Sequence, residues 1–329
     1  MPIDRFDREI NYLRISVIDR CNLRCTYCMP LEGLQFAPKP ELLTPDEIGR
    51  LVQAAVAAGF KKFRLTGGEP TLRADLAEIV RRIRAVPGVD ELAMTTNGIL
   101  LPQMAFTLAE AGLTRVNIHI DTLNDLRARQ IMRFTDLAKV WAGIEAAEAA
   151  GLTPLKLNTV VVKGVNDSED VLALAARTLE HPWHVRFIEL MPLGGGESAR
   201  FAKENFVSNQ IVMHRLERAF GALEPLPSQN PSDESRNYRI PGAPGVLGFI
   251  SPVSEPFCGT CNRMRITATG KFHLCLLHDQ EIDVREVLRS GGEEALRELL
   301  VFAVGQKPSG HDLAQGISTE IRSMYHLGG

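Results

Sequence analysis

The stretch CNLRCTYCMP, Cys21 to Pro30, contains three cysteines within eight residues, in the spacing C-x3-C-x2-C. Thiolates on a short loop suit zinc, copper(I) or an iron–sulfur cluster. A structural zinc site uses four protein ligands and a disulfide uses two, so a set of three leaves one position without a protein ligand. In a [4Fe–4S] cluster held by three cysteines, that position is an iron atom open to a small molecule. We therefore predict a metal centre in which the vacant position does the chemistry.

A second cysteine triplet lies near the other end of the chain, at Cys258, Cys261 and Cys275. These six cysteines are all that the chain contains, and residues 29–257 have none. Cysteines that serve as small core residues would not be expected to group in this way, so both triplets are predicted to bind metal. The alternative for each triplet is a set of buried core cysteines.

The overall composition excludes some classes of partner. The chain has 329 residues and a formal net charge of −3, which gives no general attraction to nucleic acid or acidic lipid. The N-terminus, MPIDRFDREI, has no apolar signal region, and no apolar run reaches the roughly 20 residues that cross a bilayer. We expect a cytoplasmic protein with reduced cysteines and neither nucleic acid nor membrane as a partner. An anionic substrate would need a local cluster of Arg and Lys.

Strand-like runs alternate with helical runs from residue 13 to about residue 220. Six strand–helix units predict a parallel sheet with crossover helices, and they are too few for a complete eight-stranded barrel. We predict an α/β fold, an incomplete (βα)6 three-quarter TIM barrel, with an open doubly wound sheet as the alternative. The predicted strands are Leu13–Ile18, Lys62–Thr66, Glu91–Thr96, Arg115–Asp121, Leu155–Val162 and His184–Leu190.

The alternation fades after about Met191, where loop-rich segments begin. We expect residues 1–225 to form the barrel domain. Residues 226–329 are expected to form a C-terminal α+β extension that covers the barrel opening and carries the second triplet.

Several local signals mark the ends of elements. The segment TPDEIGRLVQAAVAAGF predicts a helix with Thr44 as its N-cap, Glu47 completing a capping box and Gly59 ending it. A second helix is predicted within Thr135–Gly151. The segment ITATGKFHLCL predicts two short strands joined at Thr269-Gly270.

Polar side chains recur at alternate positions of four predicted strands. In a sheet covered outside by helices, such a face predicts a polar lumen that holds a ligand, since a packed barrel interior is filled by branched apolar residues. The positions are Arg14, Ser16, Arg64, Thr66, Asn117, His119, Lys156 and Asn158.

The turn RLTGGEP, Arg64 to Pro70, follows the second predicted strand. Adjacent glycines let a backbone approach a ligand closely and expose N–H groups. Glu69 has a carboxylate that can accept from an ammonium group. We expect this turn to lie at the same strand-end face as the first cysteine loop, although an ordinary βα turn would look the same.

The spacing C-x3-C-x2-C with Tyr27 before the last cysteine, followed by GGEP, resembles the radical S-adenosylmethionine enzymes. The resemblance implies that Cys21, Cys25 and Cys28 hold a [4Fe–4S] cluster whose open iron binds the methionine end of S-adenosylmethionine. An electron from that cluster would release a 5′-deoxyadenosyl radical, which abstracts hydrogen. It also implies the three-quarter (βα)6 barrel as the core domain.

Further segments narrow the resemblance to the branch of this family that cyclises GTP in the first step of molybdenum cofactor biosynthesis. They cover nearly the whole chain: NYLRISVIDRCNLRCTYCMP, FRLTGGEPTLR, MTTNG, LKLNTVVVKGVND, VRFIELMPLG and GFISPVSEPFCGTCNRMRIT. The resemblance implies a second [4Fe–4S] cluster on Cys258, Cys261 and Cys275 that binds the guanine base. The radical would take the 3′ hydrogen of the ribose, and the C3′ radical would add to C8 of guanine, a lyase reaction.

The resemblance also implies partners. They are GTP as substrate, an electron donor, and cyclic pyranopterin monophosphate synthase as the next enzyme of the pathway. Both a monomer and a homodimer stay open.

Site residues carry over position by position. Those implied to contact the adenosyl cofactor are Tyr27, Gly68, His119 and Met191. Those implied to bind GTP are Arg14, Arg64, Thr95, Lys156, Arg263, Met264 and Arg265. Among the latter, Arg14, Arg263 and Arg265 are also expected to be catalytic. A triphosphate carries about four negative charges, and Arg forks bind phosphate oxygens bidentately, which agrees with these cations.

Three positions need separate statements. His119 stands where the family most often has Ser, so it is expected either to contact the cofactor or, less readily, to be a fourth cluster ligand. His273 is expected to be a solvated strand residue. The Gly328-Gly329 tail is either a frayed terminus or, as the family suggests, a segment that enters the active site beside GTP.

Three alternative functions remain at this stage. One is another radical enzyme with an auxiliary cluster, such as a peptide-maturing one, although those usually have more C-terminal cysteines. Another is a zinc-binding interaction protein with two three-cysteine sites. A dehydrogenase-like α/β enzyme is the third, and the chain lacks a G-x-G-x-x-G after its first strand.

Overall fold

One curved sheet organises the structure, a computed structural model that describes all residues except 1, 33, 229, 314–318, 320–322 and 329. In this described part of the chain, twelve strands are joined in the order β12-β11-β10-β1-β2-β3-β4-β5-β6-β9-β8-β7. The first six strands along the sequence are β1 (Tyr12–Ser16), β2 (Lys62–Thr66), β3 (Glu91–Thr96), β4 (Arg115–His119), β5 (Lys156–Val161) and β6 (His184–Glu189).

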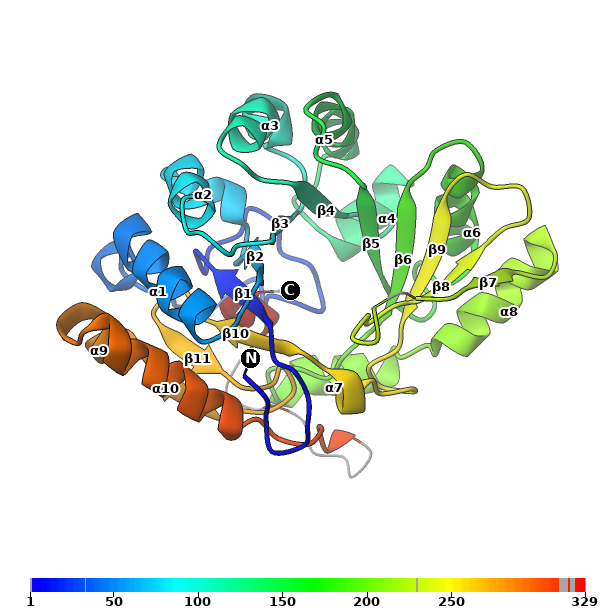
Figure 1. The fold of residues 1–329 in the computed structure, drawn as a ribbon. Coiled ribbons are helices and arrows are strands. Elements are labelled where there is room, and N and C mark those ends of the chain that lie inside the picture. Colours follow the sequence, from blue (N-terminus) through cyan, green and yellow to red (C-terminus); the bar gives the residue numbers. More distant parts are fainter. Residues whose placement is uncertain (1, 33, 229, 314–318, 320–322, 329) are drawn as a thin grey trace.

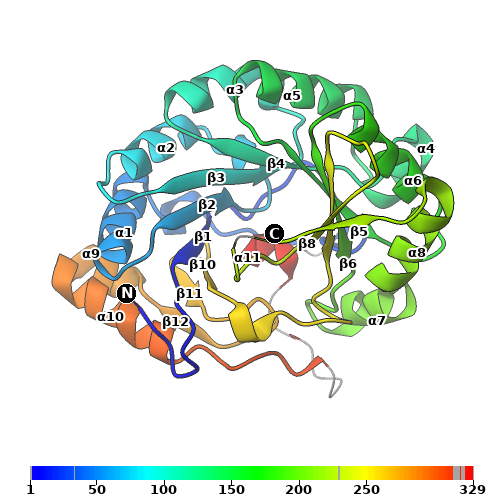
Figure 2. The same ribbon diagram turned by 45° about the vertical axis from the view of Figure 1, so that its right-hand side comes forward.

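Strands β1 to β6 are parallel, and each pairs with the next along the chain. A doubly wound sheet reverses its strand order at a switch point, and no reversal occurs among these six described strands. Helices cover the outer, convex face of the sheet (Figure 1, Figure 2). The predicted partial barrel is confirmed, and the predicted strands agree with the observed ones to within two residues at each end. The crossover helices are α1 (Pro45–Ala57), α2 (Leu76–Arg84), α3 (Leu101–Glu110), α4 (Asp125–Ile131), α5 (Leu137–Ala149) and α6 (Glu169–Ala176).

The C-terminal part adds strands to both edges of this sheet. Strand β9 (Val246–Ile250) pairs in parallel with β6, and β10 (Arg263–Ile266) pairs in parallel with β1. The short connection between β9 and β10 therefore crosses from one edge of the sheet to the other. The remaining strands extend these edges as antiparallel neighbours: β7 (Glu224–Leu226), β8 (Arg236–Arg239), β11 (Lys271–His273) and β12 (Glu281–Asp283).

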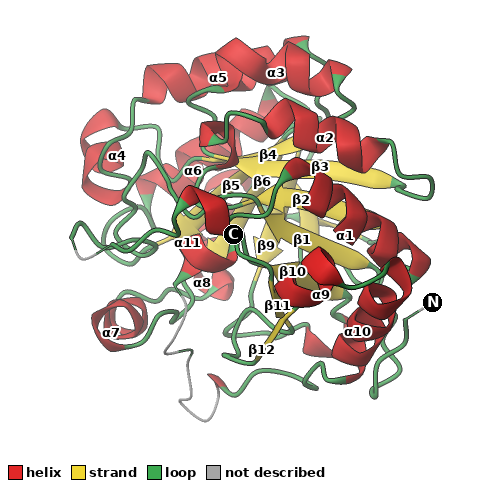
Figure 3. Cartoon of the chain, turned by 90° about the vertical axis from the view of Figure 1, so that its left-hand side faces the viewer, coloured by secondary structure: helices red, strands yellow, loops and turns green. Residues whose placement is uncertain are grey.

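The remaining α-helices of the described residues follow the sixth strand in sequence. They are α7 (Gly196–Glu204), α8 (Asn209–Phe220), α9 (Arg285–Ser290), α10 (Glu293–Gly305) and α11 (Met324–Leu327). Helix α11 lies within the curve of the sheet (Figure 2, Figure 3). None of the described helices combines the length and the apolar character that crossing a membrane would require.

Local signals in the sequence explain the ends of these elements. The Thr44 hydroxyl accepts from the Glu47 N–H at 3.2 Å, and the Glu47 carboxylate accepts from the Thr44 N–H at 2.8 Å, so the predicted capping box is confirmed. Helix α5 lies within the predicted segment, and its N-cap is Asp136. The β10–β11 connection turns at Gly270, which has a φ of 85°.

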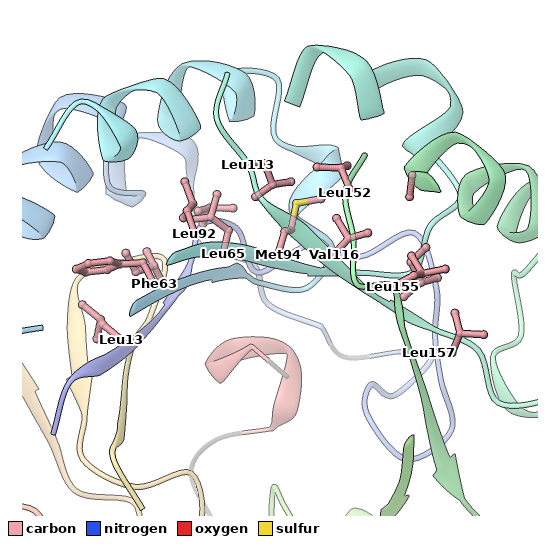
Figure 4. Packing of buried hydrophobic residues seen from close by; sticks show 14 of the residues in the cluster. Leu13, Phe63, Leu65, Leu92, Met94, Leu113, Val116, Leu152, Leu155 and Leu157 are labelled. Carbon is pink, nitrogen blue, oxygen red and sulfur yellow. The ribbon is translucent and has the colours of Figure 1, made fainter. Parts of the chain in front are cut away.

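Apolar side chains on the outer face of the sheet form the core. Leu13, Phe63, Met94 and Val116 are fully buried, and they lie between the strands and the helices (Figure 4). Successive side chains of a strand point to opposite faces, so their neighbours in sequence point into the curve of the sheet. The inner face therefore receives the polar positions of the same strands.

Candidate active site

A cavity of about 300 Å³ occupies the inner face of the sheet. Its walls come from β1 to β6, from both cysteine triplets and from segments near the C-terminus. Of the residues predicted for the site, all but Lys156 line it: Arg14, Cys21, Cys25, Tyr27, Cys28, Arg64, Gly68, Thr95, His119, Met191, Cys258, Cys261, Arg263, Met264, Arg265 and Cys275. The fold thus brings two groups of cysteines, more than 200 residues apart in sequence, to one cavity.

The Gly67-Gly68 turn positions the first cysteine loop. The Gly68 N–H donates to the carbonyl oxygen of Ile18 at 2.7 Å, and the Glu69 N–H donates to that of Arg20 at 2.8 Å. A Cβ atom on Gly68 would lie 2.2 Å from the Arg20 carbonyl oxygen, so only glycine permits this approach. Because Arg20 directly precedes Cys21, the prediction that the turn and the cysteine loop share one face is confirmed.

The side chain of Glu69 is engaged inside the protein. Its carboxylate accepts from the Thr71 N–H and hydroxyl, the Thr96 hydroxyl and the Asn97 N–H at 2.5 to 3.0 Å. Burial raises the pKa of Glu69, and these hydrogen bonds act in the opposite direction. The carboxylate therefore ties the end of β3 to the turn after β2, a structural role that the sequence did not suggest.

In the first triplet Cys25 is buried, and Cys21 and Cys28 are partly buried. Burial raises the pKa of Cys21 to about 11, of Cys25 to about 11 and of Cys28 to about 12. A bound metal centre would have to displace their protons, so binding there would be coupled to proton release.

The donor set of the first triplet can be compared with the needs of a single ion and of a cluster. Among the described residues, no three His, Cys, Asp or Glu side chains are grouped so that they could hold one metal ion. A zinc site needs its thiolates to converge on one atom at about 2.3 Å. Cysteines that hold an iron–sulfur cube each bind a different iron, so their sulfur atoms do not need to converge. Three thiolates are a donor set that an iron–sulfur cluster uses, so the residues of the first triplet fit such a group.

His119 belongs to a hydrogen-bonded group beside the first triplet. The Tyr27 hydroxyl donates to the Asp121 carboxylate at 2.6 Å and lies 2.9 Å from His119 Nε2, which is 3.2 Å from the same carboxylate. Burial alone would lower the pKa of His119, but Asp121 and a hydrogen bond to Cys25 raise it well above its ordinary value. Asp121 was not predicted as a site residue, and its position directly after a polar inward-facing strand was the signal for it.

Three arginines stand side by side across adjacent strands. Arg14 is the register partner of Arg64 on β2 and of Arg265 on β10, and neighbouring strands lie about 4.8 Å apart. Arg64 donates to the Tyr12 hydroxyl and, at 3.4 Å, to the Thr95 hydroxyl. The predicted cations of β1, β2 and β10 therefore form one row on the cavity wall.

Arg186 and Glu234 are charged residues of this cavity that were not predicted. Arg186, on β6, donates to the Asn158 side-chain oxygen at 2.9 and 2.7 Å. Its inward position follows the same alternation as Arg14 and Arg64, so the pattern on β6 could have identified it. Glu234 lies between β7 and β8 and pairs with three arginines of the cavity: Arg14, Arg186 and Arg263.

The electrostatics of this wall indicate an excess of positive charge. Burial and the charges of Arg14 and Arg263 lower the pKa of Arg265 to about 9. Burial also lowers the pKa of Arg186 to about 10, against the opposing charge of Glu234. Buried cations at such density favour the binding of an anion with several charges.

Lys156 has a different position from the other predicted cations. It begins β5, with Asn117 and His184 as its register partners, and it is half-buried outside the lining of the cavity. Burial and the charges of Arg186 and Arg115 lower the pKa of Lys156 to about 7.

The second triplet is held by residues from both ends of the chain. Arg8 donates to the Cys258 carbonyl oxygen at 2.8 Å and to that of Ser309 at 2.9 Å. The buried Lys307 ammonium group donates to the carbonyl oxygens of Arg263 at 2.8 Å and Leu274 at 2.9 Å. These bonds fix the segments that lead into the three cysteines, and neither Arg8 nor Lys307 was predicted.

The thiols of the second triplet have unequal electrostatic surroundings. Burial would raise the pKa of Cys258, but a hydrogen bond from His311 lowers it. Burial is likewise outweighed at Cys261, where the charges of Lys307 and Arg263 lower the pKa, whereas burial raises the pKa of Cys275. His311 is a further residue that the sequence did not indicate.

The prediction that His273 is solvated is wrong. Its side chain is completely buried, with Nδ1 3.2 Å from the Cys275 carbonyl oxygen and Nε2 3.7 Å from Glu281. Strand β12, which carries Glu281, pairs with β11 and contributes to this burial. Strand β12 itself was not predicted from the sequence.

The described part of the C-terminal tail lies inside the site. The Gly328 carbonyl oxygen accepts from Arg265, and a Cβ atom on Gly328 would lie 2.4 Å from Thr66 Cγ2. Gly328 has a φ of 74°, a conformation that glycine adopts at little cost. The other residue of the predicted tail, Gly329, lies outside the described residues.

Comparisons with known protein families agree with this arrangement. Residues 15–175 match the family described as the Radical SAM superfamily, and residues 183–313 match the one described as Molybdenum Cofactor Synthesis C. Curated relatives named GTP 3',8-cyclase match the chain from end to end. The protein from Pelotomaculum thermopropionicum is 46% identical over 327 residues, which is 99% of each chain. The protein from Heliobacterium modesticaldum is 46% identical over 99% of this chain and 100% of its own.

Solved structures show likeness of fold. SuiB of Streptococcus suis, solved with its precursor peptide SuiA, has a TM-score of 0.63 at 13% identity and covers 98% of this chain and 75% of its own. Methylornithine synthase (PylB) has a TM-score of 0.50 at 19% identity, over 65% of this chain and 63% of its own. At such low identity these structures support the barrel architecture alone.

Proposed function

Since the chain belongs to the GTP 3′,8-cyclase family of radical S-adenosylmethionine enzymes, we propose that it catalyses the cyclisation of GTP, the first step of molybdopterin biosynthesis. The observation that carries this proposal is 46% identity to relatives of that name across 99% of the chain. The match includes the C-terminal part, of which residues 183–313 match the family described as Molybdenum Cofactor Synthesis C.

Membership of the superfamily brings one [4Fe–4S] cluster and S-adenosylmethionine. Cys21, Cys25 and Cys28 would hold the cluster, whose bound form supplies the electron that cleaves S-adenosylmethionine to methionine and a 5′-deoxyadenosyl radical. Tyr27, Gly68, His119 and Met191 would contact the cofactor. Support for these contacts comes from the Gly67-Gly68 turn, whose hydrogen bonds to residues 18 and 20 put open backbone next to the cysteine loop.

The reaction at the substrate follows from this radical. With the cofactor bound, this radical would take the 3′ hydrogen of the GTP ribose, giving 5′-deoxyadenosine, and the C3′ radical would add to C8 of guanine to close the new ring. One electron from the external electron donor and one proton would then complete 3′,8-cyclo-7,8-dihydro-GTP. The chain's own part is to hold the ribose and the base at fixed positions, which turns the ring closure into an oriented intramolecular step.

The substrate would be held from both sides. We assign the binding of the triphosphate to four arginines, Arg14, Arg64, Arg263 and Arg265. Thr95 and Met264 would contact GTP beside them. Of the arginines, Arg14, Arg263 and Arg265 would also be catalytic. A second [4Fe–4S] cluster on Cys258, Cys261 and Cys275 would bind the guanine base. Supporting this, the cations and the second triplet line one cavity, in which Arg263 and Cys261 are two residues apart. The role of Lys156 stays a proposal with less support, because it lies outside the cavity lining.

Other parts of the assignment are proposals of the same kind. They are a cytoplasmic location, an electron donor, cyclic pyranopterin monophosphate synthase as the next enzyme, and the division of the chain into residues 1–225 and 226–329. The homodimer and the monomer both remain open.

The test is anaerobic reconstitution with iron and sulfide, followed by GTP, S-adenosylmethionine and a reductant. The expected products are 5′-deoxyadenosine and cyclised GTP in equal amounts, detected by mass spectrometry. Protein that forms 5′-deoxyadenosine without cyclised GTP would be a radical enzyme with another substrate. Colourless protein that contains zinc would contradict both cluster assignments.

A further inference from the structure

Glu234 puts a carboxylate into the arginine wall of the cavity. One of its oxygens lies 3.3 Å from Arg14 and 3.4 Å from Arg186, and the other pairs with Arg263. The Glu234 side chain is 15% exposed, so these are enclosed ion pairs rather than surface contacts. Burial would raise the pKa of Glu234, but the charges of Arg263, Arg14 and Arg186 hold it well below its ordinary value. The residue is therefore an anion at neutral pH.

The carboxylate is bound by the groups that a phosphate would use. It engages one terminal nitrogen each of Arg14, Arg186 and Arg263. Arg forks hold carboxylates and phosphates by the same geometry. A buried charge is costly without a partner, so a counter-ion here stabilises arginines that would otherwise face each other in an empty cavity.

The Glu234 carboxylate does not pair with all the hydrogen-bond donors and positive charges of the arginines in this wall. Arg14 Nε is buried and has no hydrogen-bond partner among the described residues. Arg265 makes no ion pair with a described carboxylate, and its N–H donates to the Gly328 carbonyl oxygen instead. The wall thus retains capacity for an anion that carries more charge and more oxygen atoms than a carboxylate.

We propose that Glu234 is an internal placeholder for the substrate's phosphates, which occupies their site in the empty enzyme and is displaced when a polyphosphate binds. The proposal rests on the proposed function for the identity of the natural ligand. It adds that substrate recognition is a competition between two anions for the same arginines. A single weakly charged anion would not displace a carboxylate with three partners, whereas a triphosphate would.

Displacement follows from charge and space. Phosphate oxygens that contact Arg14 and Arg263 would come within a few ångströms of the Glu234 carboxylate, and like charges repel strongly in a cavity with little water. The side chain must then leave the cluster.

The segment around Glu234 has its own hydrogen bonds, which do not involve that residue. The Asp233 carboxylate accepts from the Ser235 N–H at 3.2 Å and from the Asn237 side chain at 3.2 Å. A change at Glu234 therefore leaves these bonds of the segment intact, and the Glu234 side chain can leave without loss of the β7–β8 connection.

The experiment measures the affinity of the reconstituted, full-length protein for inorganic tripolyphosphate by calorimetry. Glu234→Gln keeps the size of the side chain and removes its charge, so tripolyphosphate should bind about tenfold more tightly than to the unchanged protein, because no charged hydrogen bonds need be broken. Guanosine, which has no phosphate, should bind equally to both. The matched control is Glu224→Gln, which removes an exposed charge on β7 and should leave both affinities unchanged.

The opposite results are equally informative. Equal or weaker tripolyphosphate binding by a folded Glu234→Gln protein would mean that Glu234 organises the arginines for substrate, and would overturn the proposal. If the variant does not fold, Glu234→Asp decides: its shorter side chain keeps the charge but withdraws the carboxylate from the arginines, so tripolyphosphate should bind more tightly than to the unchanged protein, and equal or weaker binding would overturn the proposal. Neither measurement requires catalysis, so a protein that fails the cyclase assay but passes these tests would retain the placeholder and lose only the proposed substrate.

Discussion

Arg14 and Arg265 are register partners on the parallel strands β1 and β10, so two guanidinium groups project side by side into one cavity. Like charges directly opposite each other on a sheet are destabilising. The pair is therefore a strained arrangement in the empty protein, and an anion relieves it. A substitution of one of these arginines should therefore have opposite effects on the stability of the empty protein and on its affinity for an anion.

Replacing Arg265 by Met should raise the stability of the empty protein and weaken GTP binding. The substitution removes a buried charge that its neighbours repel, which should raise the free energy of unfolding by about 1 kcal/mol. GTP should bind at least tenfold more weakly, because a charged hydrogen-bonding partner is lost. Thermal melting with and without GTP measures both. Arg236→Met, which changes an exposed arginine on β8, is the control. A less stable empty protein would show that Arg265 is held by contacts rather than strained by charge.

Lys156 should make stability depend on pH. Its folded pKa of about 7 lies below the ordinary 10.5, so between these values the unfolded chain binds a proton that the folded chain does not. Stability should therefore rise with pH from about 7 towards 10, by up to about 1 kcal/mol per pH unit, relative to Lys156→Met. Urea unfolding of both proteins at pH 7, 8 and 9 tests this. If the free energy of unfolding changed equally with pH in the two proteins, Lys156 would have an ordinary pKa.

Lys307 should be needed for the second metal centre and not for the first. Lys307→Met removes the donor to the carbonyl oxygens of Arg263 and Leu274, and the positive charge near three thiols. Loss of such outer partners typically weakens metal binding by about 10- to 100-fold. Iron and sulfide analysis after gel filtration should show loss confined to the second triplet, with cleavage of S-adenosylmethionine retained. Lys271→Met, which breaks an ion pair with Glu281, is the control. Full iron content in the Lys307 variant would contradict this role.

Gly328→Ala should lower cyclase activity by at least tenfold while both clusters form. The new Cβ atom would meet Thr66 Cγ2 at 2.4 Å, so the tail would shift away from Arg265. Gly221→Ala imposes a similar positive φ, 85°, with no atom within 4 Å of the new carbon, and so controls for backbone strain alone. Adding Thr66→Ala to the Gly328 variant should restore part of the activity. If the double variant is no better, steric contact is not the cause.

The sequence predicted the barrel because its signals are local. Alternation placed Leu13 outward and Arg14 inward, and capping residues such as Thr44 marked helix ends. Strands β9 and β10 were harder to predict from the sequence. They are short, and no crossover helix follows them to give the alternating pattern. They also pair with strands that are far away in sequence. Their pairing is decided by the completed sheet rather than by their own residues.

The residues of the site show the same difference between those that local signals could predict and those that depend on distant parts of the chain. Cysteine spacing and strand alternation identified both triplets and the row that contains Arg14 and Arg64. Arg186 follows the same alternation on β6, so the sequence carried a signal for it as well. Glu234 could not have been found, because it lies in an irregular segment where no periodicity assigns a direction to the side chain. His273 was misjudged because its burial depends on the distant strand β12.

The hydrogen bonds of Arg8 to Cys258 and Ser309 join segments that are 250 and 301 residues apart. A ribosome must therefore have released nearly the entire polypeptide before this part of the molecule can close. The first cysteine loop has no such requirement for its contacts with Gly68 and Glu69, which follow it within 50 residues. Assembly of the two cysteine triplets thus has a built-in order, in which the surroundings of the second triplet can be completed only after translation is almost finished.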